Sequence, residues 1–319
     1  MVYLIPQTNR KLFLAGIIFI ALCGNIFAQS ETPSETTVKP IVYTLFVNVI
    51  HEPTSIPLIG FVNVGIGNHA RPQIGFINYN SGDFLGFFQG SFINTIGGNL
   101  SGTQLGFINS TIGSVDGPQI GFINTTRDSI SGAQIGFINT SGKTLKGLQL
   151  GFVNYVDSIE SGIPIGLISI IRKGGYYALE YSFTEFHHFN IGLKLGIKQF
   201  YTMIFVSYNS ATEANLKHLA TGAGFGSLIP ITERLFFNPE LNSVRTYGKQ
   251  TQQLVSAVPY FGINLTNRLS IAAAPSATLQ IADGWVFDFQ RPLFGSINDV
   301  NSEKVRLIVA ARVALRVQL

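Results

Sequence analysis

Cysteine is almost absent from this chain of 319 residues, because Cys23 is the only one. A single thiol cannot form an intramolecular disulfide. Cys23 also lies in an N-terminal segment that we expect to be removed. The mature protein would then have no thiol nucleophile, no thiolate metal ligand and no disulfide.

Charge is also scarce. Asp, Glu, Lys and Arg make up 12% of the chain, against 46% hydrophobic residues, and soluble proteins carry roughly twice that share of charge. The formal net charge of +4 falls to +2 if Arg10 and Lys11 are removed. So small an excess predicts no nucleic-acid partner. Many apolar side chains must therefore face something other than water.

The N-terminus has the pattern of a secretory signal peptide. Arg10 and Lys11 precede an apolar run, and Ala28 supplies a small residue at a cleavage point. We therefore expect residues 1–28 to be a cleaved signal peptide. A retained transmembrane anchor and lipidation of Cys23 are the alternatives.

Two features mark residues 29–56. The segment 30–40 is polar and rich in Thr, Glu and Pro, which predicts a linker. Residues 41–50 alternate between apolar and polar side chains. We expect a first strand there, which would add to the barrel described below.

A repeat of fifteen residues fills the region 57–173. Each copy contains a glycine followed by Phe-Ile-Asn or a close variant, and these glycines are Gly60, Gly75, Gly106, Gly121, Gly136, Gly151 and Gly166. A degenerate copy that starts at Gly90 fills the one gap if a single inserted residue is allowed. A constant period indicates one supersecondary unit stacked on itself.

The repeat length suits a parallel β-solenoid, in which equivalent residues stack about 4.8 Å apart. The repeated asparagines, expected near a bend, would form a ladder in which each amide bonds the next: Asn63, Asn78, Asn94, Asn109, Asn124, Asn139 and Asn154. Simple alternation places Ile135, Phe137 and Asn139 on one face, and Gln134 and Ile138 on the other. We favour the solenoid, with an antiparallel meander or barrel wall as the alternative.

The repeats resemble the bacterial surface-repeat family named for leptospiral surface proteins, whose members carry tandem Gly-x-Gln-Ile-Gly-Phe/Leu-Ile-Asn units. The match is carried by residues 102–109, 117–124, 132–139 and 147–154, within about 115 residues of repeat. Copies at the ends depart from it, since Leu58 and Pro164 replace the glutamine and Ser169 replaces the asparagine. The resemblance implies a cell-surface or outer-membrane setting, and it transfers no catalytic residue and no ligand.

The region 174–319 changes to long, clean alternation. Over the last fifteen residues, apolar side chains occupy every second position, and Arg306, Arg312 and Arg316 lie on the other face. Strands this long predict lipid on one side and a polar lumen on the other. Eight such segments predict a small antiparallel outer-membrane barrel, at about 176–186, 189–198, 200–209, 218–229, 234–246, 254–265, 268–281 and 305–319.

The barrel interpretation has three further parts. The final strand resembles the assembly signal of outer-membrane barrels, although Leu319 stands where that signal usually has an aromatic residue. Aromatic residues are expected in girdles at the membrane interfaces: Tyr176, Tyr177, Phe200, Tyr201, Phe236, Phe237, Tyr260, Phe261 and Trp285. The arginines either line an anion-preferring lumen or pair with Glu180, Glu185 or Glu240 inside a plugged barrel. A soluble antiparallel sandwich is the alternative fold.

No catalytic, cofactor-binding or metal-binding constellation stands out. His187 and His188 are adjacent and would point to opposite faces of a strand, and nothing orients a nucleophile beside His218. We therefore expect a non-enzymatic outer-membrane or cell-surface protein, exported by a double-membraned bacterium. Its expected partners are outer-membrane lipid and an unidentified surface ligand, and a pore for small solutes is the alternative function.

Overall fold

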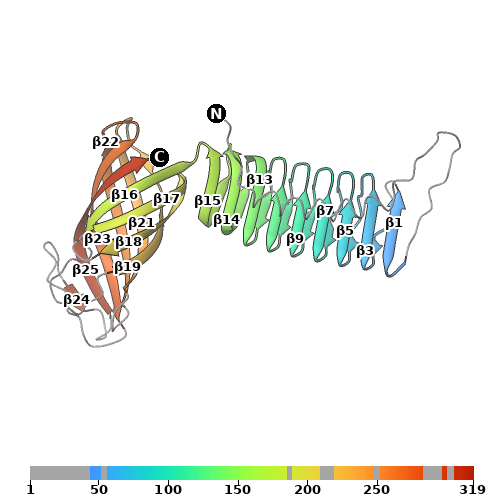
Figure 1. Cartoon of the computed structure of the whole chain (residues 1–319), viewed down its shortest axis with the longest axis horizontal. Helices are drawn as coiled ribbons and strands as arrows, with labels where there is room; N and C mark the ends of the chain where they lie inside the picture. Colours follow the sequence, from blue (N-terminus) through green and yellow to red (C-terminus); the bar gives the residue numbers. More distant parts are fainter. Residues whose placement is uncertain are drawn as a thin grey trace. The chain divides into compact units, whose positions relative to one another are not determined.

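A computed structural model describes residues 44–51, 56–184, 189–208, 219–246, 252–282, 297–299 and 305–319. Strands β1–β15 form one sheet and β16–β25 form another (Figure 1). The predicted all-β fold is confirmed, with a parallel solenoid of about eight turns and a closed antiparallel barrel of eight strands. The predicted signal peptide lies outside the described residues. Within the described ranges, no helical segment has the length and hydrophobicity of a membrane crossing.

Each solenoid coil has two short strands separated by a bend. The strands before the bend are β2 (Leu58–Ile59), β4 (Gln73–Ile74), β6 (Phe88–Gly90), β8 (Thr103–Leu105), β10 (Pro118–Ile120) and β12 (Ala133–Ile135). Those after it are β1 (Val47–His51), β3 (Val62–Ile66), β5 (Ile77–Asn80), β7 (Ile93–Ile96), β9 (Ile108–Thr111), β11 (Ile123–Thr126) and β13 (Ile138–Leu145). Strands β14 (Leu148–Ile159) and β15 (Ile163–Lys173) continue through both positions.

The described pairings between these strands are parallel and join equivalent residues of successive copies, such as Asn124 with Asn139. The antiparallel meander is therefore wrong for the repeats. The strand expected within residues 41–50 is present in part as β1, but it pairs with β3. It belongs to the solenoid and not to the barrel.

The bend at each repeat glycine changes which side chains face inward. Gln134 and Asn139 are both fully buried, whereas Ile135 and Phe137 are both exposed. The predicted division of faces was wrong because alternation does not continue through the bend. At Gly136 the backbone leaves no space for a side chain, since a Cβ there would lie 2.1 Å from the carbonyl oxygen of Gly121 in the coil below.

Two amide ladders run through the solenoid interior. Each asparagine from Asn48 to Asn139 donates its amide to the asparagine of the following coil, over 2.7–3.1 Å. The glutamines from Gln89 to Gln149 donate to the preceding coil, over 2.6–2.8 Å. The two ladders therefore run in opposite directions. The asparagines lie within strands and not at the bend, because the backbone there pairs in register with the next coil.

Two more interior columns complete the packing of each coil. One contains Ile96, Thr111, Thr126 and Ser141 in successive coils. The other is joined by isolated bridges and contains Phe84, Leu100, Val115, Ile130 and Leu145. The members of this second column are fully buried and form the main apolar core of the solenoid.

The degenerate copy carries its extra residue at a different place from the one predicted. In register, Gly90 stacks between Ile74 and Leu105, so Ser91 takes the place of the bend glycine without an insertion. The extra residue comes earlier, because Phe84 stacks on Leu100 after sixteen residues whereas Phe88 pairs with Thr103 after the ordinary fifteen. The additional residue is therefore Phe87, which is 83% exposed.

The barrel strands are β16 (Tyr176–Thr184), β17 (Phe189–Ile197), β18 (Phe200–Tyr208), β19 (Leu219–Gly226), β21 (Leu235–Thr246), β22 (Gln252–Asn264), β23 (Leu269–Ala282) and β25 (Val305–Gln318). Short strands β20 (Ile229–Pro230) and β24 (Ile297–Asp299) pair with β21 and β25. Neighbours are antiparallel, and pairing of β16 with β25 closes the ring.

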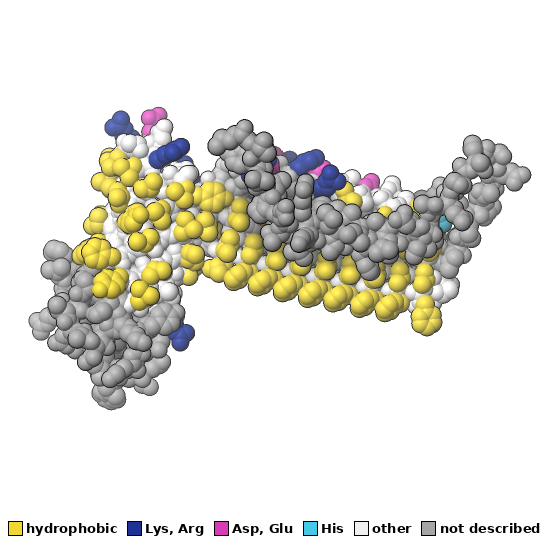
Figure 2. Space-filling view, viewed as in Figure 1, with side chains coloured by type: hydrophobic (Ala, Val, Ile, Leu, Met, Phe, Trp, Pro, Cys, Tyr) yellow, Lys and Arg dark blue, Asp and Glu magenta, His cyan; other side chains and the backbone are white. Residues whose placement is uncertain are grey.

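The barrel is polar inside and apolar outside. Along β25, Arg312 and Arg316 are buried, whereas Val309, Val313 and Leu315 are 40–57% exposed. Figure 2 shows hydrophobic side chains over the outer surface of the barrel. A soluble sandwich would require the reverse arrangement. The alternation therefore matches that of strands that face hydrocarbon.

Four of the aromatic residues expected in interface girdles lie inside the barrel instead. Tyr176, Tyr201, Phe236 and Tyr260 are at most 4% exposed. The girdle interpretation was wrong for them because they share strand parity with inward-facing residues. Phe261, at 59% exposed, does face outward. Trp285 lies outside the described residues.

Candidate functional site

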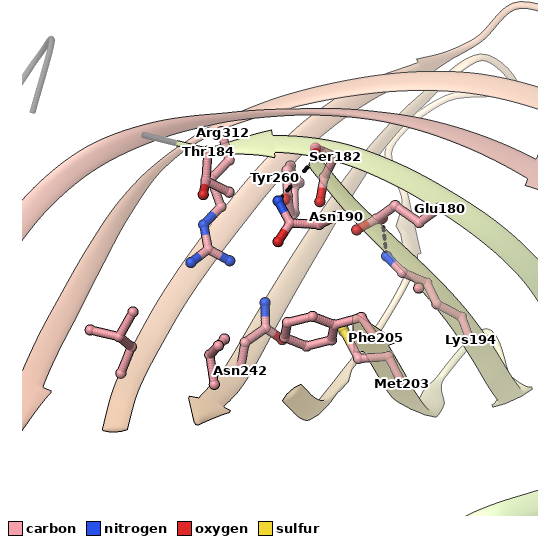
Figure 3. A pocket seen from close by; sticks show the side chains of 13 residues that line it. Glu180, Ser182, Thr184, Asn190, Lys194, Met203, Phe205, Asn242, Tyr260 and Arg312 are labelled. Carbon is pink, nitrogen blue, oxygen red and sulfur yellow. Dashed lines mark hydrogen bonds and ion pairs between the residues drawn. The ribbon is translucent and has the colours of Figure 1, made fainter. Parts of the chain in front are cut away.

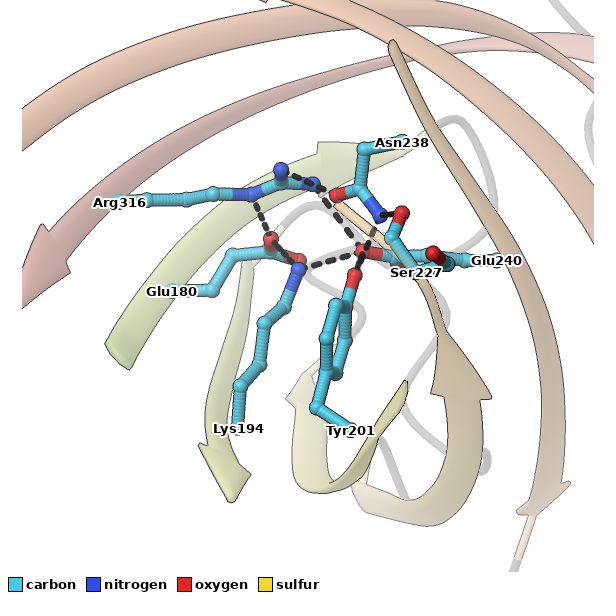
Figure 4. Close-up of polar contacts among 7 residues, drawn as sticks. All are labelled: Glu180, Lys194, Tyr201, Ser227, Asn238, Glu240 and Arg316. Atoms are coloured by element: carbon cyan, nitrogen blue, oxygen red, sulfur yellow. Dashed lines mark hydrogen bonds and ion pairs between the residues drawn. The ribbon is translucent and has the colours of Figure 1, made fainter. Parts of the chain in front are cut away.

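A cluster of charged and polar side chains fills the interior of the barrel (Figure 4). It contains Glu180 from β16, Lys194 from β17, Tyr201 from β18, Asn238 and Glu240 from β21, and Arg316 from β25. Its four charged side chains are only 0–8% exposed. We call these six residues the interior cluster.

Arg316 makes the most contacts in the interior cluster. Its Nε donates to Glu180 Oε2 at 2.5 Å and its Nη2 donates to Glu240 Oε1 at 3.1 Å. Its Nη1 donates to Asn238 Oδ1. The guanidinium carbon also lies 4.8 Å from the ring centroid of Tyr260. Hydrogen bonds and ring contacts together replace the water that a buried arginine loses.

Lys194 and Tyr201 also donate hydrogen bonds to Glu240. The Lys194 Nζ donates to Glu240 Oε1 at 2.5 Å and also forms an ion pair with Glu180. Tyr201 donates its hydroxyl to the same Glu240 oxygen at 2.6 Å. Two cations thus face two carboxylates, and the interior cluster has no formal net charge. It has the form of a structural ion-pair network in which the buried Glu240 Oε2 has no hydrogen-bond partner in the described residues.

Strand register explains why these residues meet. Glu180 and Arg316 are direct cross-strand partners at the β16–β25 closure, which joins residues 136 positions apart in sequence. Lys194 lies two residues beyond Gly192, the partner of Glu180 on β17. Side chains at such positions lie on one face of a sheet and reach each other.

A small cavity remains beside the interior cluster (Figure 3). Its volume is about 20 Å³, and Glu180, Lys194 and Tyr260 border it. Arg312 also lines it and donates its Nη2 to Ser256 Oγ at 2.9 Å. A space of this size holds roughly one water molecule. This cavity itself has no room for a solute.

The three predicted lumen arginines have different outcomes. Arg312 and Arg316 both point into the barrel, and Arg316 pairs with Glu180 and Glu240. The side chain of Arg306 and all of Glu185 lie outside the described residues. Sequence reasoning missed Lys194, Tyr201 and Asn238. The signal for Lys194 was present, because it occupies an even position in the alternating run 189–198.

Each charged group of the interior cluster is held by an opposite charge, and the cavity beside it is too small for a substrate. Among the residues that the structure describes, no group of three or more His, Cys, Asp or Glu side chains lies close enough to hold a metal ion. His187, His188 and His218 lie outside the described ranges.

Comparison with known proteins identifies no relative. No protein-family model matches the chain, no curated protein matches it, and no solved structure matches it at a significant level.

Proposed function

We propose that this chain is a non-enzymatic outer-membrane protein in which the barrel anchors the β-solenoid at the cell surface, in a structural or partner-binding role. One observation carries the proposal: the eight-stranded barrel is closed and has apolar side chains outside and a charged cluster inside. Closure leaves no unpaired strand edge in hydrocarbon, which is the condition for spanning a bilayer with strands.

The regular solenoid supports a structural or display role. Its coils differ mainly in the loops that carry charge, while the strands repeat almost unchanged. Stacked units of this kind generally provide an extended surface. Export by a signal peptide and membership of the leptospiral-type surface-repeat family are parts of this proposal.

The alternative function is a pore for small solutes. A charged barrel interior is what such a function would use. However, the interior cluster occupies the space between the strands, and the adjacent cavity holds about one water molecule. Barrels of eight strands are just wide enough for side chains to fill. These observations favour an anchor.

Planar-bilayer recording distinguishes the two functions. The full chain, refolded and checked by the mobility shift of folded barrels on unheated gels, should show no stepwise conductance. A Lys194→Ala/Glu240→Ala/Arg316→Ala variant that passes the same gel check serves as the matched control. It removes three of the four charged side chains of the interior cluster, which should open a water path. Stepwise current through the unaltered protein would overturn the anchor and establish the pore.

A further inference from the structure

An apolar ridge runs along the solenoid, on both sides of the bend, and one side has a gap at Gly90. One column consists of stacked phenylalanines, Phe61, Phe76, Phe92, Phe107, Phe122, Phe137 and Phe152. The neighbouring column consists of Ile59, Ile74, Leu105, Ile120, Ile135 and Leu150. We call these two columns the apolar ridge.

The apolar ridge is large and highly ordered. Successive rings lie 4.8–5.2 Å apart and within 5° of parallel. Each phenylalanine is 43–56% exposed. A phenylalanine has roughly 150–250 Å² to bury, so the seven rings alone present on the order of 480–790 Å². The largest apolar patch on an ordinary monomer is about 300–600 Å², and larger ones mark contact sites.

Charge is segregated from the apolar ridge. The solenoid residues 56–173 contain eleven Asp, Glu, Lys and Arg residues, and none of them lies between the glutamine position and the asparagine position of its coil, where the ridge residues lie. The positions that flank the ridge are apolar or carry uncharged Ser and Thr. Figure 2 shows rows of hydrophobic side chains along one edge of the solenoid and charged side chains along the opposite edge.

The connection to the barrel keeps the solenoid close to the membrane. Strand β15 ends at Lys173 and β16 begins at Tyr176, so only Gly174 and Gly175 separate them. Two residues span at most about 7 Å. In addition, Thr202 Oγ1 of β18 donates to the carbonyl oxygen of Leu167 at 2.9 Å. If the barrel spans a bilayer, the last coil lies beside it.

We propose that the apolar ridge rests in the interfacial region of the bilayer that holds the barrel, with the charged side of the solenoid facing water. This inference rests on the proposed function. It assigns the ridge to lipid in the way that a strongly amphipathic helix lies in a membrane interface, about 5–10 Å deep.

Lipid suits this surface better than a second copy of the chain does. The ridge repeats every coil, so two ridges could pair equally well after a slip of one coil of about 5 Å. No charged residue lies on the ridge to fix one register. The two columns also flank a bend, so two copies would touch along a narrow line. A fluid hydrocarbon surface needs no register and fits such an edge.

Tryptophan quenching by brominated lipids tests the proposal on the full chain. Replacing the only tryptophan with Trp285→Phe gives a silent background. Phe122→Trp then reports on the apolar ridge, Asp116→Trp on the charged side and Val313→Trp on the barrel exterior. Each protein is refolded into phosphatidylcholine vesicles, with bromine near the headgroup end of the acyl chains, and is checked by the gel shift. Phe137→Trp replaces the first reporter if that variant fails to fold.

The expected result is about a two-fold loss of emission for Phe122→Trp, because a face at that depth reaches the brominated carbons. Asp116→Trp should be unaffected and Val313→Trp should be quenched. If the Val313→Trp variant is quenched and the Phe122→Trp variant is not, the ridge proposal is overturned and the membrane barrel stands. Quenching of neither would overturn both. Crosslinking of Phe122→Cys between copies in vesicles, with Phe122→Trp unquenched, would assign the ridge to a second copy.

Discussion

His69 is the first residue of the buried interior column that continues with Phe84 in the following coil. Later coils have aliphatic residues in this column. His69 is only 2% exposed, and its Nε2 has no hydrogen-bond partner in the described residues. Burial lowers the pKa of His69 below its ordinary value of 6.5, and a hydrogen bond to the Arg71 backbone offsets part of this effect. The neutral form is therefore the one that fits the fold.

This position predicts a pH-dependent weakness in the first coils. The unfolded chain binds the His69 proton more tightly than the folded chain does, so stability is lost as pH falls below about 6.5. We expect the thermal midpoint of the solenoid, followed by circular dichroism, to fall between pH 7.5 and pH 5.5. His69→Leu should reduce this fall, since later coils carry Leu100 and Leu145 in this column. An equal fall in both proteins would contradict the account.

The amide ladders end where a single residue in the next coil cannot continue them. Pro164 stacks on Gln149, and Ser169 stacks on Asn154. Neither replacement continues its ladder, and Gln149 Oε1 and Asn154 Nδ2 have no partner in the described part of the chain. The atypical copies noticed in the sequence are therefore the places where the ladders stop.

At the scale of the element, each coil depends on its neighbours through the ladders. Asn124 accepts from Asn109 at 2.8 Å, and it donates to Asn139 at 2.9 Å and to the carbonyl oxygen of Ile135 at 3.0 Å. These groups are buried away from water. A residue that cannot hydrogen-bond would leave Asn139 Oδ1 of the following coil without this donor and Asn109 Nδ2 of the preceding coil without one of its acceptors.

We therefore expect Asn124→Leu to destabilise the solenoid by at least about 2 kcal/mol, since each buried polar group left unpaired costs about 1–3 kcal/mol. Thr125→Val is the matched control, because Thr125 is the next residue on the same strand and points outward. Denaturant unfolding followed by circular dichroism measures both. A loss no larger than that of the control would show that the ladder contributes little.

The sequence predicted the solenoid because a spacing of fifteen residues separates the asparagines from Asn63 to Asn154, with one step of sixteen, whatever the loops contain. It did not predict the glutamine ladder, because Gln134 and Asn139 have opposite parity and only a bend at Gly136 brings both inside. The need for glycine at that bend comes from its close contact with the backbone of the coil below, which the sequence alone does not show. The shift of the extra residue to Phe87 likewise depends on register.

At the scale of the whole molecule, alternation was sufficient to predict the eight barrel strands, because an apolar exterior and a polar interior force a strict period of two. Alternation did not predict which charges meet. Glu180, Lys194 and Arg316 are brought together by closure of the ring between β16 and β25. Strand alternation would have predicted that the side chain of Tyr176 points into the barrel with that of Glu180, since both lie on one face of β16.

The central claim is that the outward side chains of the barrel face hydrocarbon. Nitroxide labels placed singly at Val309, Ala311, Val313 and Leu315 along β25, in an otherwise cysteine-free chain refolded into vesicles, test it most directly. The account predicts high collision rates with oxygen and low rates with a water-soluble nickel complex at all four positions. Nickel accessibility equal to that of an exposed site on the charged side of the solenoid, such as Asp116, would show that these strands face water and would contradict it.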